Sequence, residues 1–185
     1  MKDAFLFYVV GRSGVGKDTV LNQLRSVNGC TVAHRYITRK PEAVGENHIH
    51  LTSEEFIERR ALGAFLLDWE AHGHRYGIGI EVKHWLACGM SVFVNGSRHC
   101  LAQTRTLLGQ QMVSVLIDAN DEVCHQRIAQ RGRESQVEIK ARMLRESVDK
   151  AAFDWVIDNS GPLEDTINAI HHVFQSTVTK KSRVQ

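Results

Sequence analysis

The stretch YVVGRSGVGKDTVLNQL, from Tyr8 to Leu24, has the spacing G-x-x-x-x-G-K between Gly11 and Lys17. It follows the apolar run 4–10 and leads into a helical pattern, which is the context of a phosphate-binding loop. In such a loop, backbone N–H groups turn toward phosphate oxygens and the lysine reaches the outer phosphates. We therefore expect ATP to bind here and Lys17 to act in catalysis. The expected ATP contacts are Gly11, Arg12, Ser13, Gly14, Val15, Gly16, Lys17, Asp18 and Thr19.

Asp18 occupies the position where this motif normally has a serine or threonine whose hydroxyl meets Mg²⁺. A carboxylate is a good ligand for a hard cation, so one interpretation is that Asp18 binds the metal. Asn95 ends the apolar run 91–95, near the place where such a strand commonly has an aspartate for Mg²⁺. We expect Asp18 and Asn95 to divide the binding of Mg²⁺. In the alternative interpretation, Asp18 only caps the helix and interacts favourably with its dipole.

The composition of the chain indicates a soluble protein with small anionic ligands. Its 185 residues are 43% hydrophobic, which is enough for one well-buried domain over residues 1–185. A net charge of +2 argues against general binding to nucleic acid, and the four cysteines have neither metal-ligand nor disulfide spacing. No apolar run reaches the ~20 residues that cross a bilayer. We expect a cytoplasmic protein with small-molecule partners and no nucleic-acid or membrane partner; the sequence leaves a homodimer open.

Apolar runs alternate with helical patterns along the chain. The runs that predict buried strands are 4–10, 91–95, 112–119 and 153–158. The patterns that predict helices are 19–24, 119–132 and 162–174. This alternation is typical of a three-layer α/β fold, in which a parallel sheet has helices on both faces. From about residue 35 to 80 the pattern changes to short strands, 48–51 and 65–73, around a helix at 53–61, so we expect an inserted subdomain.

The segment from about residue 126 to 146 is rich in arginine and has acid–base pairs at helical spacing, such as Glu138 with Arg142. A guanidinium group binds two phosphate oxygens and stays charged, so arginines are suited to hold a phosphoryl group during its transfer. Because it follows a phosphate-binding loop, this segment predicts a helical lid that closes over the substrates. The alternative is a helix whose charged face is only solvated.

Four stretches together resemble one known family, the guanylate-kinase-like P-loop phosphotransferases. They are GRSGVGKDT from residue 11, YITRKPEAVGENHIHLTSEEF from residue 36, RIAQRGRES with IKARM in the expected lid, and FDWVIDNSGPLED from residue 153. The resemblance covers nearly the whole chain. It implies that Arg127, Arg131 and Arg142 contact the phosphates of ATP and the phosphoryl group in transfer, with catalytic roles for Arg131 and Arg142. It also implies that Asn159 lies near the adenine and the loop.

The region that would bind the phosphoryl acceptor departs from guanylate kinases. Arg39 matches an arginine that holds phosphate, but Glu42 replaces a second one, and Arg35 replaces a serine that reads guanine. His48 stands where a phosphate-binding tyrosine is expected, whereas Tyr76 is retained. A site built to pair the polar edge of a base loses much affinity when those partners are missing. We therefore expect GMP to be a poor acceptor.

A narrower group within the family accounts for these changes. The stretches GKDT, RYITR, GENHI and VNGSR resemble the ribose 1,5-bisphosphate phosphokinases. The resemblance implies transfer of a phosphoryl group from ATP to ribose 1,5-bisphosphate, which forms 5-phospho-α-D-ribose 1-diphosphate (PRPP) in phosphonate catabolism. The substrate contacts that it implies are Arg35, Arg39, His48, Arg75, Tyr76 and Arg98. Two alternatives stay open: a guanylate-type nucleoside monophosphate kinase, and a binding module of this fold that has lost catalysis.

Overall fold

The centre of the molecule is a parallel sheet of five strands. The computed structural model describes residues 4–26, 29–40, 47–130 and 149–181. Strand β1 (Leu6–Val10) lies in the middle of the sheet, whose strand order is β2-β7-β1-β8-β9. The other strands are β2 (Cys30–Val32), β7 (Ser91–Asn95), β8 (Met112–Asp118) and β9 (Trp155–Asp158). Each neighbouring pair runs parallel, as the continuous apolar runs predict.

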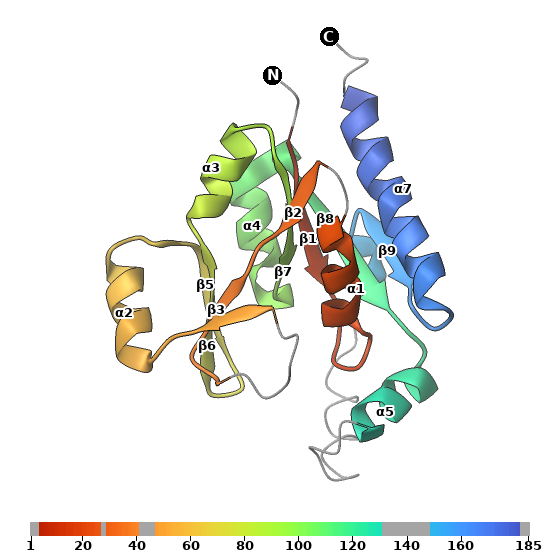
Figure 1. The fold of residues 1–185 in the computed structure, drawn as a ribbon, viewed down its shortest axis with the longest axis horizontal. Helices are drawn as coiled ribbons and strands as arrows, with labels where there is room; N and C mark the ends of the chain where they lie inside the picture. Colours follow the sequence, from red (N-terminus) through yellow and green to blue (C-terminus); the bar gives the residue numbers. More distant parts are fainter. Residues whose placement is uncertain (1–3, 27–28, 41–46, 131–148, 182–185) are drawn as a thin grey trace.

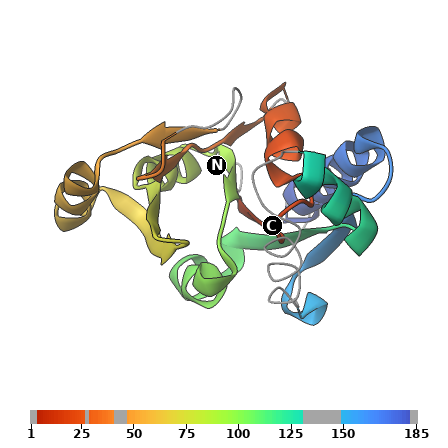
Figure 2. The ribbon, with the colours of Figure 1, turned by 90° about the horizontal axis from the view of Figure 1, so that it is seen from below.

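Helices cover both faces of this sheet (Figures 1 and 2). One face is covered by α1 (Lys17–Gln23) and α7 (Leu163–Lys181). The other face is covered by α3 (Glu81–Ala87) and α4 (Leu101–Leu108). Successive residues of β1 point to opposite faces: Phe7 packs in the core with α1 and α7, and Tyr8 packs in the core with α3 and α4. The expected three-layer α/β fold is therefore confirmed.

One further helix, α5 (Asp121–Gln130), follows β8 at the carboxyl edge of the sheet. The described residues also form single 3₁₀ turns, which are η1 (Leu24–Ser26), η2 (Arg98–Cys100), η3 (Gly109–Gln111) and η4 (Lys150–Ala152). Among the helices of the described ranges, none combines the length and the apolar character that a membrane span requires.

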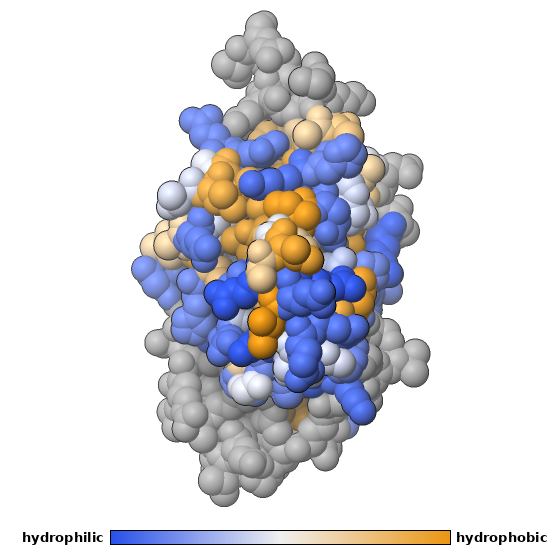
Figure 3. All heavy atoms as spheres, turned by 90° about the vertical axis from the view of Figure 1, so that its left-hand side faces the viewer, coloured by the Kyte–Doolittle hydropathy of each residue, from blue (hydrophilic) through white to orange (hydrophobic). Residues whose placement is uncertain are grey.

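A second sheet of four strands stands beside the first, with the order β4-β3-β6-β5. Its strands are β3 (Arg35–Ile37), β4 (His48–His50), β5 (Phe65–Ala71) and β6 (His74–Gly79). Helix α2 (Ser53–Ala61) begins at a capping box formed by Thr52 and Glu55, and its Phe56 stacks on Phe65. Figure 3 shows this side of the molecule, where apolar surface lies among polar side chains. The sheet occupies the part of the sequence for which the inserted subdomain is predicted.

Tyr8 joins the middle of the central sheet to the turn after β7. Its ring is fully buried, and its hydroxyl donates to the carbonyl of Ser97 at 2.8 Å and accepts from the Ser97 N–H at 2.9 Å. The ring also lies against Gly96, where a Cβ atom would come within 2.2 Å of it. Burial raises the pKa of the Tyr8 hydroxyl well above its usual value, so the hydroxyl stays protonated and keeps both roles.

We expect Tyr8→Phe to lower the free energy of unfolding by about 1–3 kcal/mol, because both backbone groups of Ser97 lose their partner. Tyr36→Phe is the matched control: its hydroxyl makes one long contact of 3.4 Å with Glu81 and is only half-buried. Its effect should stay within about 0.5 kcal/mol. Urea unfolding of both variants measures the difference, and equal losses would contradict the role given to Tyr8.

Candidate active site

The loop between β1 and α1 lies at the carboxyl end of the central strand (Figure 1), where α/β folds bind their ligands. Two of its glycines, Gly14 and Gly16, have positive φ angles of 82° and 90°. A side chain at Gly16 would also place its Cβ atom 2.7 Å from Nδ2 of Asn159. Glycine is therefore required at both positions, and the loop keeps the shape that turns backbone N–H groups toward a phosphate.

Lys17 is the first residue of α1, so its ammonium group lies at the mouth of the loop. The ammonium donates to the carbonyl oxygen of Gly11 and, at 3.0 Å, to that of Arg12. These contacts hold the positive charge over the loop. An anionic phosphate in the loop would compete with the two carbonyl groups for this charge.

Asn159 fixes the loop from the other end of the chain. Its buried side chain donates from Nδ2 to the carbonyl oxygen of Val15 at 2.6 Å, and its Oδ1 accepts from the Thr166 hydroxyl at 2.7 Å. Arg127 of α5 donates to the same Val15 carbonyl at 3.3 Å. Two distant segments, the end of β9 and α5, therefore meet at the Val15 carbonyl of the loop. Thr166 supports Asn159 and is a residue that the sequence does not predict.

A cavity of about 310 Å³ opens between the loop and these supporting residues. It is lined by Gly16, Thr19, Arg127, Gln130, Asn159 and Leu163. Four of these residues belong to the predicted ATP site, so the structure brings the start of α1 together with α5 and the end of β9. Gln130 and Leu163 are lining residues that the sequence does not predict.

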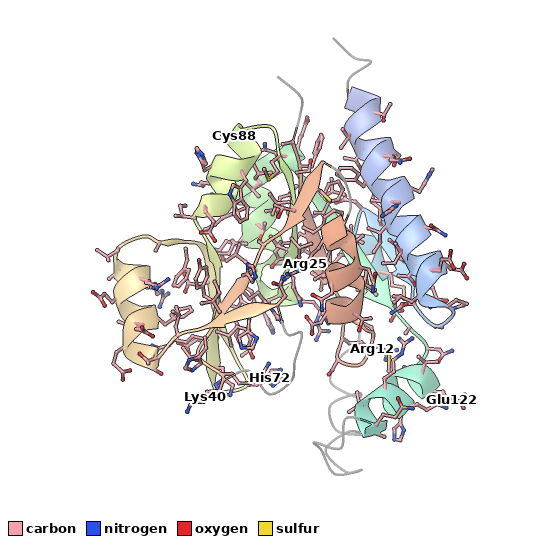
Figure 4. The ribbon with its side chains drawn as sticks, in the orientation of Figure 1. Arg12, Arg25, Lys40, His72, Cys88 and Glu122 are labelled. Carbon is pink, nitrogen blue, oxygen red and sulfur yellow. The ribbon has the colours of Figure 1, made fainter. Side chains whose placement is uncertain are left out.

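The side chain of Arg12 points away from the loop toward α5 (Figure 4). It forms ion pairs with Asp121 at 2.5 Å and Asp118 at 3.6 Å, and it donates to the carbonyl oxygen of Ala119 at 2.6 Å. The side chain thus anchors the loop to the junction between β8 and α5. In this position Arg12 can contact ATP through its backbone but not through its side chain.

Asp118 links this anchor to the chain after residue 148, because its second oxygen meets Nζ of Lys150 at 2.7 Å. Partial burial of the carboxyl group raises its pKa, but Lys150, the Ala119 N–H and Arg12 together hold the pKa below its usual value. The carboxylate therefore stays charged at neutral pH. The sequence does signal Asp118, since it lies at the end of a buried apolar run, but its partners Arg12 and Lys150 are distant in the chain.

Asp18 lies inside the first turn of α1, and the N-cap residue is Gly16. The capping interpretation is therefore wrong, although a carboxylate in this turn still interacts favourably with the helix dipole. Its Oδ1 accepts from Nδ2 of Asn95 at 2.8 Å and lies 3.4 Å from Nη2 of Arg35. One oxygen of Asp18 thus connects the loop with the end of β7 and with the second sheet.

Asn95 is buried, and its amide NH₂ group is the part that faces Asp18. Its Oδ1 accepts no hydrogen bond within the part of the chain that the structure describes. A metal takes oxygen and not an amide NH₂ group as its ligand. In this arrangement the amide NH₂ group of Asn95 orients the Asp18 carboxylate.

Three of the predicted substrate contacts share one face of the second sheet. Arg35 pairs with His48 in register, and Ile37, two residues after Arg35, pairs with Tyr76. Because side chains opposite each other in register lie on the same face, Arg35, His48 and Tyr76 point to one side. This side faces the loop, since Arg35 reaches Asp18. Tyr76 also stacks on Trp69, with 5.5 Å between ring centroids and 6° between planes.

The other predicted contacts are less closely grouped. Arg75, next to Tyr76, is on the opposite face of β6 and forms an ion pair with Glu70 at 2.9 Å, so the structure does not bring it to the loop side. Arg39 and Arg98 are half-buried just beyond the ends of β3 and β7. Arg131 and Arg142, and most of the expected lid, lie outside the described residues.

Comparison with known proteins now assigns the chain to a family. The family model described as guanylate kinase matches residues 6–177. The chain belongs to the guanylate kinase family. A crystal structure of guanylate kinase from Anaplasma phagocytophilum has the same fold, with a TM-score of 0.72 at 17% identity over 97% of this chain and 89% of that one.

Other relatives are more similar in sequence to this chain than that guanylate kinase is, and they are named as a different kinase. The chain is 42% identical to ribose 1,5-bisphosphate phosphokinase PhnN of Pantoea vagans, over 93% of this chain and 98% of that one. It is 47% identical to the protein of the same name from Burkholderia pseudomallei, over 86% and 89%. The predicted resemblance to this group of the guanylate kinase family is confirmed.

Proposed function

We propose that this chain transfers the γ-phosphoryl group of ATP to the 1-phosphate of ribose 1,5-bisphosphate and so forms PRPP. The observation that carries the proposal is the position of Arg35. A cation replaces a base-reading group on the acceptor face, and its Nη2 lies 3.4 Å from Asp18 of the phosphate-binding loop. The names of the relatives, which match over nearly the whole chain, support the same acceptor. The proposal also includes a single domain over residues 1–185, a cytoplasmic location and use of the product in phosphonate catabolism.

The described residues divide into two groups in this reaction. Backbone N–H groups of the loop and the Lys17 ammonium bind the phosphates of ATP, while the cavity beside Thr19, Arg127 and Asn159 receives the rest of the nucleotide. Arg35 and His48 hold the phosphates of the sugar on the facing side. The attacking phosphate is already an anion, so the site needs no general base, and catalysis follows from positioning and charge stabilisation.

Mg²⁺ fits this donor set. In the described ranges, no cluster of three or more His, Cys, Asp or Glu side chains could hold a metal. Mg²⁺ commonly takes one or two carboxylates, keeps several waters and binds substrate phosphates, so a single carboxylate beside the loop is sufficient. Asp18 would be that ligand, with Asn95 holding the carboxylate in place. When bound, Mg²⁺ neutralises charge that develops on the phosphates during transfer.

We expect Asp18→Asn to raise the Mg²⁺ concentration needed for half-maximal nucleotide binding by about tenfold, because the charged ligand is lost while its shape is kept. Asp165→Asn is the matched control, since Asp165 is an exposed acid in the first turn of α7. Titration of both variants with Mg²⁺ and a non-hydrolysable ATP analogue measures the effect. An unchanged Mg²⁺ dependence in Asp18→Asn would remove Asp18 from the metal site.

Product identification tests the proposed reaction itself. Purified protein is mixed with ATP, Mg²⁺ and ribose 1,5-bisphosphate, and ³¹P NMR follows the new diphosphate of PRPP. Absence of PRPP, together with formation of GDP when GMP replaces the sugar, would favour the nucleoside monophosphate kinase instead. If the protein binds no ATP at all, the result would favour the third alternative, a binding module of this fold that has lost catalysis.

A further inference from the structure

We infer that Arg35 couples the two substrates, so that binding of the phosphorylated sugar strengthens binding of Mg²⁺ with ATP. The inference rests on the proposed acceptor and goes beyond it, because it concerns the cooperation between the two sites. It starts from the contact between Arg35 of the second sheet and Asp18 of the loop.

The carboxylate of Asp18 is held from two sides. Asn95, at the end of β7, donates to Oδ1 at 2.8 Å and fixes its orientation within the central sheet. Arg35 approaches the same oxygen from β3, in the other sheet. The side chain of Arg35 is only 18% exposed and that of Asp18 is 41% exposed, so solvent screens this pair less than a surface pair.

The guanidinium group of Arg35 weakens the attraction of the Asp18 carboxylate for a metal. A positive charge next to the carboxylate partly neutralises it and also repels a divalent cation at the second oxygen. The contact of 3.4 Å is longer than the 2.7–2.9 Å of a strong charge-assisted hydrogen bond, so one oxygen of Asp18 is a weak partner for the guanidinium group. Asp18 therefore attracts Mg²⁺ more strongly when another anion takes the guanidinium group.

A phosphate of the acceptor is such an anion. It offers two oxygens to the guanidinium fork, which is a better partner than one oxygen at long range. His48, paired in register with Arg35 on the same face, lies where it can bind the same phosphate. When the acceptor attracts Arg35, Asp18 regains its full charge toward Mg²⁺. Thermodynamic coupling between two binding sites is reciprocal, so Mg²⁺ with ATP also strengthens binding of the acceptor.

Calorimetry on the full chain tests this coupling. Mg²⁺ with a non-hydrolysable ATP analogue is titrated into the protein with and without saturating ribose 1,5-bisphosphate. In the unsubstituted protein we expect the sugar to lower the Kd of the analogue by at least about fivefold. In Arg35→Met we expect the Kd of the analogue to be nearly the same with and without the sugar. We also expect this variant, without sugar, to bind the analogue more tightly than the unsubstituted protein in Mg²⁺ but not in a chelator.

Arg60→Met is the control, because it removes another ion pair of the same subdomain, with Asp68 at 2.9 Å, far from the loop in sequence. It should keep the coupling of the unsubstituted protein. Retention of that coupling in Arg35→Met, or no gain in its Mg²⁺-dependent affinity, would overturn the inference. If the sugar binds to no form of the protein, the proposed acceptor fails, and the Mg²⁺ titration alone still decides whether Arg35 weakens the metal site.

Discussion

Lys17→Met is expected to lower kcat by about 10³-fold or more, which would be the largest effect of a single substitution in this chain. The ammonium group stands at the mouth of the loop, held by the carbonyl groups of Gly11 and Arg12. From there it can reach the outer phosphates and neutralise charge that increases as the phosphoryl group leaves ATP. Methionine keeps most of the volume of the side chain and removes only this charge.

Lys83→Met is the control for Lys17→Met, since Lys83 is an exposed lysine on α3. Its kcat should equal that of the unsubstituted protein. Thermal unfolding of both variants shows whether the loop stays folded without the ammonium group. A folded Lys17→Met variant with kcat within about tenfold of the unsubstituted protein would contradict the catalytic role of Lys17.

Asn159→Ala is expected to lower the free energy of unfolding by about 2–4 kcal/mol and to weaken ATP binding. The buried amide makes short hydrogen bonds with the Val15 carbonyl and the Thr166 hydroxyl. Its removal leaves these two groups only their longer contacts of 3.3 Å, with Arg127 and with the Asp158 carbonyl. The Val15 carbonyl belongs to the loop itself. Its release should therefore disturb the phosphate-binding geometry as well as the stability.

Urea unfolding and titration with an ATP analogue measure the two effects of Asn159→Ala. Asn168→Ala, at an exposed position of α7, is the matched control and should change neither quantity. Loss of stability with unchanged ATP affinity would mean that Asn159 supports the fold but not the loop.

The sequence predicts well those parts of the molecule that depend on local patterns. The loop from Gly11 to Lys17 is a contiguous motif, and its glycines are required by its own backbone angles. The strands at 4–10 and 112–119 are continuous apolar runs, and the structure confirms them as β1 and β8 with ends that differ by a few residues. The start of α7 was also predictable, but the helix extends beyond the predicted end at residue 174 to Lys181.

Other elements could not be predicted because their signal is short or mixed. β2 has only three residues, one of them a threonine, and is stabilised by pairing with β7. The helices α3 and α4 have few buried residues each, so their apolar periodicity is weak. In the second sheet β3 and β6 contain charged and polar residues that pack only because β4 and β5 lie beside them.

The directions of side chains at the site also could not be predicted from the sequence. Arg12 is part of the loop motif, yet its side chain leaves the loop because Asp118 and Asp121 attract it across more than a hundred residues of chain. The opposite directions of Arg75 and Tyr76 depend on the alternation within β6, which is defined only once the strand is placed. The link between Asp18 and Arg35 likewise needs both sheets.

A competition between two acceptors tests the central claim most directly. Ribose 1,5-bisphosphate and GMP are mixed at equal concentration with the protein, Mg²⁺ and ATP labelled in its γ-phosphoryl group, and the two labelled products are separated. The ratio of label gives the ratio of kcat/KM for the acceptors. We predict that PRPP receives at least about 10²-fold more label than GDP. Label found mainly in GDP would contradict the account.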